Sequence, residues 1–540
     1  MPRYQYAPFA YQKPPELGGA KPSGAPVIIV GAGPVGLAAA IDCALHGVRC
    51  IVLDDNNVVS IGSRAICWSK RTLEIFDRLG VGERMVEKGV TWKVGRLFHR
   101  NREVWNFDLL PEAGHKMPAF INLQQYYAEQ YLVERAADFP DLIDLRWNNK
   151  VTGLERRDDG VTVEIETPDG AYSLEADWLI ACDGARSPLR TMMGLDFEGR
   201  IFEERFLIAD VEMKADFPSE RWFWFEPTFH PGQSALLHKQ PDNIYRIDLQ
   251  LGWDADPEEE KKPENVIPRI EKVLGHSDFE LDWVSVYTFQ CRRLARFVHG
   301  RVVFAGDSAH IVSPFGARGG NGGIQDTDNL IWKLAAILRG EAPESLIQTY
   351  DEERTYGSDE NIANSARATS FMTPKSEMEK LFREAVLDLA GEHDFARRLV
   401  NSGRLSRPCS LAGMQLQTPS RGGEGVEPGT AMPDAPVANG EAGPDWLLAH
   451  CGGGFAVMSV DAEIPDGLPS ELNRIAVTGD PARRTNDGSA LFDVEGLVAR
   501  RYGAGNVYLL RPDQHVAARF RNPTVGEIMA ALERATGTAQ

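Results

Sequence analysis

A glycine-rich segment near the start of the chain has the spacing of a dinucleotide phosphate-binding turn. The pattern G-x-G-x-x-G lies between an apolar run at 27–30 and helix-forming residues at 37–41. The first glycine allows a tight turn, the second lets a pyrophosphate approach the backbone, and the third lets the helix pack closely on the strand. The N–H groups and positive end of the helix then face the phosphates. The residues concerned are Gly31, Gly33, Pro34, Val35 and Gly36.

Two acidic residues, Asp54 and Asp55, close the next apolar run at 48–53. A carboxylate there accepts hydrogen bonds from ribose hydroxyls, which assigns this role to Asp54. Strand, turn, helix and strand form a βαβ unit with a right-handed crossover. The fingerprint alone does not separate FAD from NAD, and a glycine-rich turn beside a chance acid is the plain alternative.

Two later segments place carboxylates at the ends of apolar runs, and a third, rich in glycine, precedes a helix. Asp183 follows the run 178–181, and Gly306 with Asp307 follows the run 302–305. A strand that ends in Gly-Asp exposes a carboxylate at the carboxyl edge of the sheet, although a helix cap is its ordinary role. The glycine-rich run 316–323 leaves N–H groups free at the start of the next helix.

The combination resembles class A flavoprotein aromatic hydroxylases of the phenol hydroxylase, 3-(3-hydroxyphenyl)propionate hydroxylase and pentachlorophenol monooxygenase type. The motifs are Asp183-Gly-Ala-Arg-Ser, Gly306-Asp307-Ser-Ala-His and the run from Pro314 to 334. With the fingerprint they cover about 26–360. The resemblance implies that FAD is held by Gly31, Gly33, Pro34, Val35, Gly36, Asp54, Asp55, Asp183, Gly306, Asp307, Pro314, Gly319, Gly320 and Asn321.

The resemblance also implies cofactor contacts from Arg64 and Gln125, with Gln124 as an alternative match. An arginine and a glutamine on helices are more often solvated. Arg318 stands where many relatives have glutamine, which leaves the local flavin contact open.

A single-component monooxygenase reaction is what the resemblance implies. NADPH or NADH reduces the FAD from a transient site, since no second G-x-G-x-x-G follows. Dioxygen then adds at flavin carbon 4a, and the hydroperoxide hydroxylates a small aromatic, phenolic substrate in aromatic catabolism. Tyr245 and His238 are the candidates for activating the phenol. A half-buried strand tyrosine and a merely packed histidine are the alternatives.

These motifs require a mixed α/β fold. We expect a Rossmann-type FAD-binding domain, an inserted antiparallel-sheet substrate domain as in para-hydroxybenzoate hydroxylase, and a small thioredoxin-like C-terminal domain. The last resembles that of phenol hydroxylases, from about Pro428 to Asp513, but lacks Cys-x-x-Cys, so packing or dimerisation is its expected role. The expected divisions are an N-terminal arm 1–25, the FAD domain 26–200 and 291–410, the substrate domain 201–290, a linker 411–430 and the C-terminal domain 431–540.

The composition limits the classes of partner that this protein is expected to bind. A net charge of -20 disfavours nucleic acid, which needs clustered Lys and Arg. No apolar run is long enough for a membrane helix. Seven scattered cysteines indicate a reducing cytoplasm, with neither disulfides nor a metal site. The expected partners are a small aromatic substrate, O2, NAD(P)H and a second copy in a homodimer.

Three other functions share the fingerprint. A flavin-dependent halogenase is one, since the segment 222–227 is similar to its Trp-x-Trp-x-Ile-Pro motif, but Glu226 replaces Ile. A non-catalytic FAD-binding protein that recruits a partner is the second. A quinone-linked membrane hydroxylase is the third, weakened by the lack of an apolar terminal helix.

Overall fold

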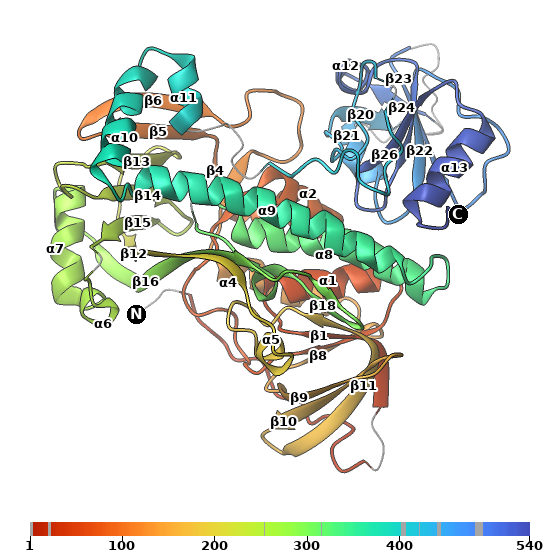
Figure 1. The fold of residues 1–540 in the computed structure, drawn as a ribbon, viewed down its shortest axis with the longest axis horizontal. Helices are drawn as coiled ribbons and strands as arrows, with labels where there is room; N and C mark the ends of the chain where they lie inside the picture. Colours follow the sequence, from red (N-terminus) through yellow and green to blue (C-terminus); the bar gives the residue numbers. More distant parts are fainter. Residues whose placement is uncertain are drawn as a thin grey trace.

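A computed structural model describes residues 4–19, 23–252, 254–314, 316–400, 407–420, 422–439, 444–480 and 490–539. The described residues therefore leave out 1–3 and 20–22 of the expected arm and 421 of the expected linker. They also leave out short stretches of the expected FAD, substrate and C-terminal domains. Three lobes are visible, joined by two long helices that cross the middle of the molecule (Figure 1). These helices are α8 (Gly319–Leu338) and α9 (Leu346–Met372).

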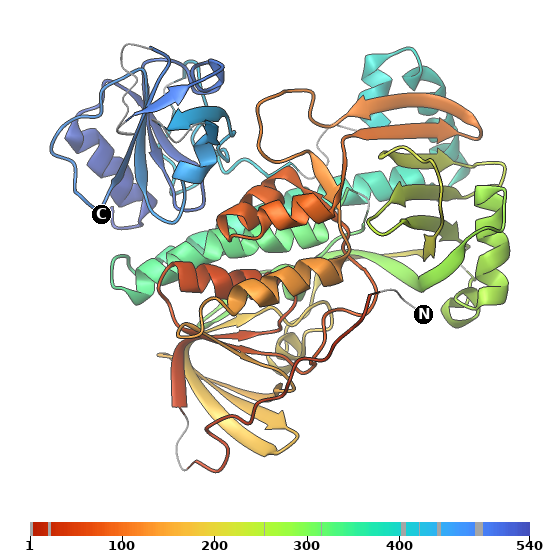
Figure 2. The same ribbon diagram turned by 180° about the vertical axis from the view of Figure 1, so that it is seen from behind.

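The central lobe is built on an eight-stranded sheet with the order β17-β18-β11-β1-β2-β8, extended by β10 and β9. β18, β11, β1, β2 and β8 run parallel, as expected for a βαβ core. Helix α1 packs between α4 and α8, and the β9–β10 hairpin extends on the other side (Figure 2). The bounds are β1 (Ser23–Val30), α1 (Pro34–Leu45), β2 (Cys50–Leu53), α2 (Lys70–Arg78), α3 (Gly82–Lys88), α4 (Gln125–Ala136), β8 (Ile143–Arg146), β9 (Lys150–Arg156), β10 (Val161–Thr167), β11 (Gly170–Ala181), α5 (Pro188–Met192), β17 (Val298–His299), β18 (Val302–Phe304) and η1 (Gly306–Ser308).

A second eight-stranded sheet, ordered β19-β16-β12-β15-β14-β13-β5-β6, forms the next lobe. Its alternating apolar residues pack under α7 on one face, where Val266 and Ile270 close a core with Ile247 and Leu249. The other face turns toward the central lobe. The bounds are β5 (Val94–His99), β6 (Arg102–Asp108), β12 (Glu198–Glu212), β13 (Arg221–Phe225), β14 (Ser234–Lys239), β15 (Ile244–Leu251), α6 (Pro257–Glu260), α7 (Pro263–Leu274), β16 (Glu280–Arg293), β19 (His310–Ile311), α10 (Glu377–Ala390) and α11 (Asp394–Val400), with a small sheet of β3 (Cys67–Ser69), β7 (Phe120–Asn122) and β4 (Val90–Trp92) between the lobes.

The C-terminal lobe is a seven-stranded sheet with the order β21-β20-β24-β23-β22-β25-β26. It stands above the end of α8 and the start of α9 (Figure 1). There Phe455 packs edge-on against Trp332 at 5.6 Å. The bounds are β20 (Pro436–Asn439), β21 (Pro444–Trp446), η2 (Leu447–His450), β22 (Ala456–Val460), β23 (Asn473–Thr478), β24 (Leu491–Asp493), α12 (Leu497–Tyr502), β25 (Asn506–Leu510), β26 (Val516–Arg521) and α13 (Val525–Ala535).

The mixed α/β architecture is confirmed, but several boundaries differ from the sequence expectation. β1 begins within the expected arm, because 23–25 pair with 174–176 of β11. Residues 94–108, expected in the FAD domain, join the second sheet through β13. The local sequence at 469–474 predicts a short helix, but this prediction is wrong: β23 begins at Asn473, because pairing with β22 overrides local propensity. The arm itself packs on the central lobe, where Phe9 stacks on Trp147 at 4.5 Å.

Candidate active site

The three glycines of the turn after β1 have different surroundings. A Cβ on Gly31, whose φ is +105°, would lie 2.4 Å from the carbonyl oxygen of Cys182. A Cβ on Gly36 would lie 1.9 Å from the carbonyl oxygen of Gly31, so no larger residue fits either position. A Cβ built on Gly33 would meet no atom of the described residues within 4 Å, and Gly33 directly precedes Pro34 at the start of α1. The turn is therefore closed on its protein side and open above the helix N-terminus, the kind of position at which helices can hold a phosphate.

Val35 is the point at which three distant segments meet. A Cβ on Gly306 would lie 2.9 Å from the Val35 side chain, and one on Gly323 of α8 would lie 2.7 Å from it. The dinucleotide turn, the Gly-Asp motif and α8 therefore pack against one another at one edge of the parallel sheet. This convergence places their polar groups around a common volume.

Asp54, at the end of β2, accepts hydrogen bonds from the backbone N–H of Ala32 at 2.6 Å and of Asn56 at 2.9 Å. Burial raises the pKa of Asp54 to about 6, although both hydrogen bonds lower it. Asp55 is exposed. Asp54 thus fixes the glycine turn and keeps further lone pairs for a ribose diol.

Asp183 lies beside the same turn, since its backbone nitrogen is 3.2 Å from a Cβ built on Gly31. Its Oδ2 accepts from Ser187 Oγ at 2.8 Å and from Leu189 N at 3.0 Å. Its Oδ1 is buried and has no hydrogen-bond partner in the described part of the chain. Burial raises the pKa of this carboxyl group. The buried Oδ1 of Asp183 can therefore accept a hydrogen bond from a polar ligand.

Asp307 faces the start of α8, since a Cβ on Gly319 would lie 4.0 Å from its Oδ1. Burial raises the pKa of Asp307, while the positive charges of His310 and Arg64 lower it. The Arg64 side chain is exposed, yet its field reaches this carboxylate. Asp307, Arg64 and the positive end of α8 therefore surround one volume.

The start of α8 is held against β3. The chain turns at Pro314, whose carbonyl accepts from Ala317 N at 3.0 Å. Asn321 accepts from Ser69 N at 2.9 Å and donates to the carbonyl oxygen of Ala317. A Cβ on Gly320 would lie 3.4 Å from the side chains of β3 and its preceding loop. Asn321 thus positions the helix start, and its amide is already satisfied by protein groups.

Gln125 is likewise satisfied within the protein. Its Oε1 accepts from Ala65 N at 3.1 Å, and its Nε2 donates to Ser60 Oγ and Glu129 Oε1, both at 2.8 Å. Gln125 therefore anchors the loop that carries Arg64. The alternative, Gln124, donates to a backbone carbonyl but leaves a buried Oε1 without a partner among the described residues.

The residues of this edge fit FAD. An open helix N-terminus suits a pyrophosphate, the carboxylates of Asp54 and Asp307 suit polyol hydroxyls, and the unpartnered Oδ1 of Asp183 offers one more acceptor. Bound FAD supplies two-electron reduction and oxygen chemistry, and the protein supplies binding and orientation.

Tyr245 lies on the face of the second sheet that α7 covers. Its hydroxyl donates to the carbonyl oxygen of Ala215 at 2.9 Å, and its ring packs in the apolar core with Ile247 and Leu249. The structure therefore does not bring Tyr245 together with the segments around Val35. Strand alternation explains this placement, because Tyr245 shares its face with apolar neighbours.

His238 occupies the opposite face, which turns toward the β3 loop. Its Nδ1 lies 4.0 Å from Cys67 Sγ, and its Nε2 lies 3.9 Å from Asp248 Oδ2, too far for a hydrogen bond. Burial lowers the pKa of His238 to about 4, so the imidazole is neutral near pH 7. Arg221 reaches the same sulfur at 4.0 Å.

Sequence reasoning missed the charged partners on this face. Arg246 donates to both Asp210 oxygens at 2.8 Å and to the carbonyl oxygen of Ser63 in the Arg64 loop. The signal was present, since Arg246 and Asp248 alternate with apolar residues along β15. Tyr287 was also missed. Burial raises its pKa most, and the negative charge of Asp307 raises the pKa further, so this phenol lies close enough to Asp307 to feel its charge.

Two further searches bear on the site. Among the described residues, no group of three or more His, Cys, Asp and Glu side chains is placed to hold a metal ion. Within the same part of the chain, no helix combines the length and apolar character needed to cross a membrane.

Comparison with known proteins identifies the class. The model of a family described as an FAD binding domain matches residues 24–365. The chain therefore belongs to this family, that of the class A flavoprotein aromatic hydroxylases. FAD is its cofactor, and the protein is a flavin-dependent hydroxylase.

Individual relatives differ in how much of the chain they match. A 3-(3-hydroxy-phenyl)propionate/3-hydroxycinnamic acid hydroxylase of Mycolicibacterium smegmatis is 29% identical over 62% of this chain, and the match spans 58% of that relative's length. A 12-dehydrotetracycline 5-monooxygenase/anhydrotetracycline 6-monooxygenase of Streptomyces rimosus is 28% identical over 91% of this chain and 94% of its own. The crystal structure of the flavin-dependent monooxygenase PieE with FAD and substrate is similar in fold, with a TM-score of 0.76 and 22% identity over 96% of this chain and 100% of that one.

Proposed function

We propose that this protein hydroxylates a phenolic compound with NAD(P)H and O2, binding the phenol between the second sheet and the β3 loop. The observation that carries the proposal is a group of buried polar atoms on this sheet face without partners among the described residues. They are His238 Nε2, Asp248 Oδ1, Arg221 Nε and Gln240 Oε1. Folded proteins rarely leave such atoms unpaired, so their concentration beside the Arg64 loop favours a polar ligand.

In this proposal the neutral His238 accepts a hydrogen bond from the phenolic hydroxyl, since its buried Nε2 has no partner among the described residues. Arg221 and Arg246 favour the phenolate that forms, because each carries a buried positive charge on the same face. Asp210 and Ser63 hold the Arg246 side chain in place. The loop and sheet together exclude water from the reacting ring.

Two substrate classes are candidates. A small phenol fits the names of the propionate hydroxylases, which match 62% and 61% of the chain. A polycyclic phenol is favoured by the tetracycline-pathway relatives, which match 91% and 96% of the chain. The use of NADH or NADPH as the reductant and a role in aromatic catabolism are further parts of the same proposal.

The test is to purify the protein, record the flavin spectrum, and screen phenols of both sizes for stimulated NAD(P)H oxidation with an oxygenated product. Stimulation without product would mean that the compound acts only as an effector. Chloride-dependent products from free reduced flavin would replace the proposal with halogenation. Bound flavin with no stimulation by any phenol would favour the non-catalytic alternative.

A cytoplasmic homodimer is a further part of the proposal. Its support is an apolar surface on α10 and α11, where Met378, Phe382 and Phe395 are 72%, 55% and 61% exposed. Monomers rarely expose such clusters, and a second copy would cover them. Light scattering of wild type and of the Phe382→Glu variant tests this: a dimer that dissociates in the variant supports it, and a monomeric wild type contradicts it.

A further inference from the structure

A cavity of about 520 Å³ lies between the central and C-terminal lobes. It is bounded by β3, α2 and β7, by the loop after β6, by the segments that flank the linker and by α12. Its lining includes Ser69, Leu109, Glu112, Phe120, Arg407 and Arg500. A volume of roughly 300–1,000 Å³ is typical of small-molecule sites.

One wall of this cavity is basic, although the chain carries a net charge of -20. Within the described residues, Arg407, Arg500 and Arg501 have no ion pair with a carboxylate. The terminal nitrogens of Arg501 are already engaged by protein groups, because they donate to the backbone carbonyl oxygens of Ala113, Gly114 and Asp434 and contact His115 Nε2. Arg407 and Arg500 therefore supply the free guanidinium donors of this wall, which suit an anion with several oxygens.

The opposite wall is apolar and adjoins the cofactor-binding edge. Leu109, Leu110 and Phe120 line the cavity and pack in one cluster with Ala317, in the turn before α8. Ser69, at the cavity edge, donates to the Asn321 side chain of α8 at 2.9 Å. The cavity therefore extends from the basic wall to the segment beside which the flavin binds.

We propose that this cavity is the transient binding site for the nicotinamide dinucleotide, with its pyrophosphate at Arg407 and Arg500. The nicotinamide end then lies along the apolar wall, directed at the start of α8. This inference rests on the proposed use of NAD(P)H. It explains how a chain with a single G-x-G-x-x-G accommodates two dinucleotides, because arginine side chains replace a second glycine turn.

The test uses the FAD-loaded Arg407→Ala/Arg500→Ala variant, in which Arg501 and its carbonyl contacts are retained. Arg534→Ala, at an exposed arginine on α13, is the matched control. Stopped-flow reduction measures the Kd for NADH and NADPH and the limiting rate. Calorimetry measures binding of NAD+, NADP+ and inorganic pyrophosphate without turnover. We expect Kd to rise about tenfold for each arginine removed, with the limiting rate unchanged.

Other outcomes would overturn the inference. An unchanged nucleotide Kd in the double variant excludes the site, and so does a raised KM for the aromatic substrate alone, which would make the wall a carboxylate-recognition surface. If the wild type never oxidises NAD(P)H, the proposed function fails by itself. NADP+ and pyrophosphate binding that depends on Arg407 and Arg500 would then still support the anion site, and its absence would contradict it.

Discussion

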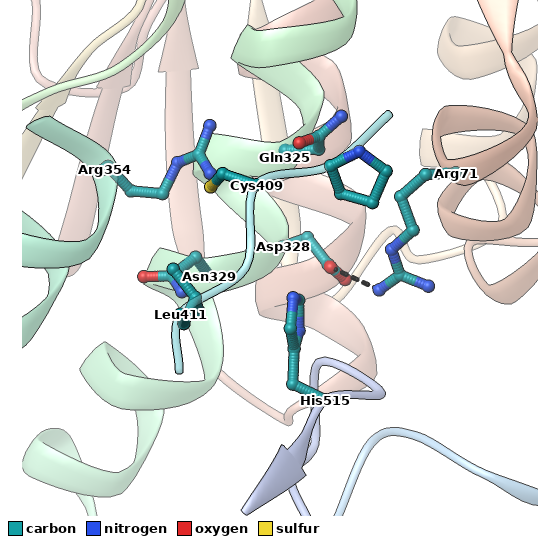
Figure 3. A pocket seen from close by; sticks show the side chains of 9 residues that line it. Arg71, Gln325, Asp328, Asn329, Arg354, Cys409, Leu411 and His515 are labelled. Carbon is teal, nitrogen blue, oxygen red and sulfur yellow. Dashed lines mark hydrogen bonds and ion pairs between the residues drawn. The ribbon is translucent and has the colours of Figure 1, made fainter. Parts of the chain in front are cut away.

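Arg511 of the C-terminal lobe forms a two-pronged ion pair with Glu353 of α9, with distances of 2.7 and 3.0 Å, and both side chains are buried. Beside it, Arg71 of α2 pairs with Asp328 of α8 at 2.8 Å, next to His515 from the C-terminal lobe (Figure 3). The C-terminal lobe is therefore fixed to the FAD-binding core by buried charge, and the two parts support each other's stability.

Glu353→Gln should destabilise the junction by about 3 kcal/mol or more, because it leaves buried positive charge without its partner. Burial alone would raise the pKa of Glu353, but Arg511 and Lys333 lower it far below its usual 4.5. Since the folded pKa is the lower one, this stabilisation is complete above pH 4.5 and is lost as the pH falls below it. Thermal melting at pH 7 and at pH 4 measures both effects.

Glu341→Gln is the control, because this exposed carboxylate pairs only with Arg339 at the surface. It should leave the melting temperature unchanged. Equal melting of Glu353→Gln and wild type at pH 7 would show that the buried pair does not stabilise the junction.

Gly33→Ala and Gly36→Ala should fail for different reasons. The Gly33 position has a φ of -74° and open space, so Gly33→Ala should fold normally but lose FAD affinity by about tenfold or more, because the new methyl group occupies the phosphate approach. In Gly36→Ala the methyl group would lie 1.9 Å from a carbonyl oxygen, so folding itself should suffer. FAD titration combined with circular-dichroism melting separates the two. Normal FAD affinity in a folded Gly33→Ala protein would contradict the phosphate assignment.

Asp307→Ala should weaken FAD binding by about 30-fold, or ~2 kcal/mol, if this buried carboxylate accepts from cofactor hydroxyls. Asp159→Ala is the matched control, because Asp159 is exposed at the turn between β9 and β10 and is not among the residues assigned to FAD. Equilibrium dialysis of FAD against both apoproteins gives the comparison. Equal dissociation constants for the two variants would remove Asp307 from the site.

Local sequence pattern predicted the dinucleotide turn and its surrounding elements. The G-x-G-x-x-G spacing between a strand and a helix is typical of this turn, and the turn lies where the spacing predicts it. The polar sheet face was harder. Whether Tyr245 or Arg246 faces the cofactor depends on strand register, since a shift of one residue exchanges the two faces.

The interdomain contacts were beyond sequence reasoning for another reason. Glu353 and Arg511 are 158 residues apart, and neither belongs to a recognisable motif. A charged residue in a helix such as α9 is usually solvated, so only the packing of the C-terminal lobe shows that Glu353 is buried. The basic wall formed by Arg407 and Arg500 has the same origin, because it brings the segment before the linker beside α12.

His238→Asn and Tyr245→Phe form the sharpest pair for the catalytic site. His238→Asn should lower phenol hydroxylation by about 100-fold, because it removes the imidazole nitrogen that orients the phenolic hydroxyl, while FAD content stays normal. Tyr245→Phe should lose only the hydrogen bond to the Ala215 carbonyl, which costs about 1 kcal/mol of stability and leaves turnover within a factor of two.

Since the pKa of His238 is lowered to about 4, wild-type turnover should show no histidine ionisation between pH 6 and 8. The neutral imidazole stabilises the fold above pH 6.5, and this contribution is lost as the pH falls toward 4. Product formation across this pH range for all three proteins decides the matter: a Tyr245→Phe protein as impaired as His238→Asn would return the tyrosine to the site.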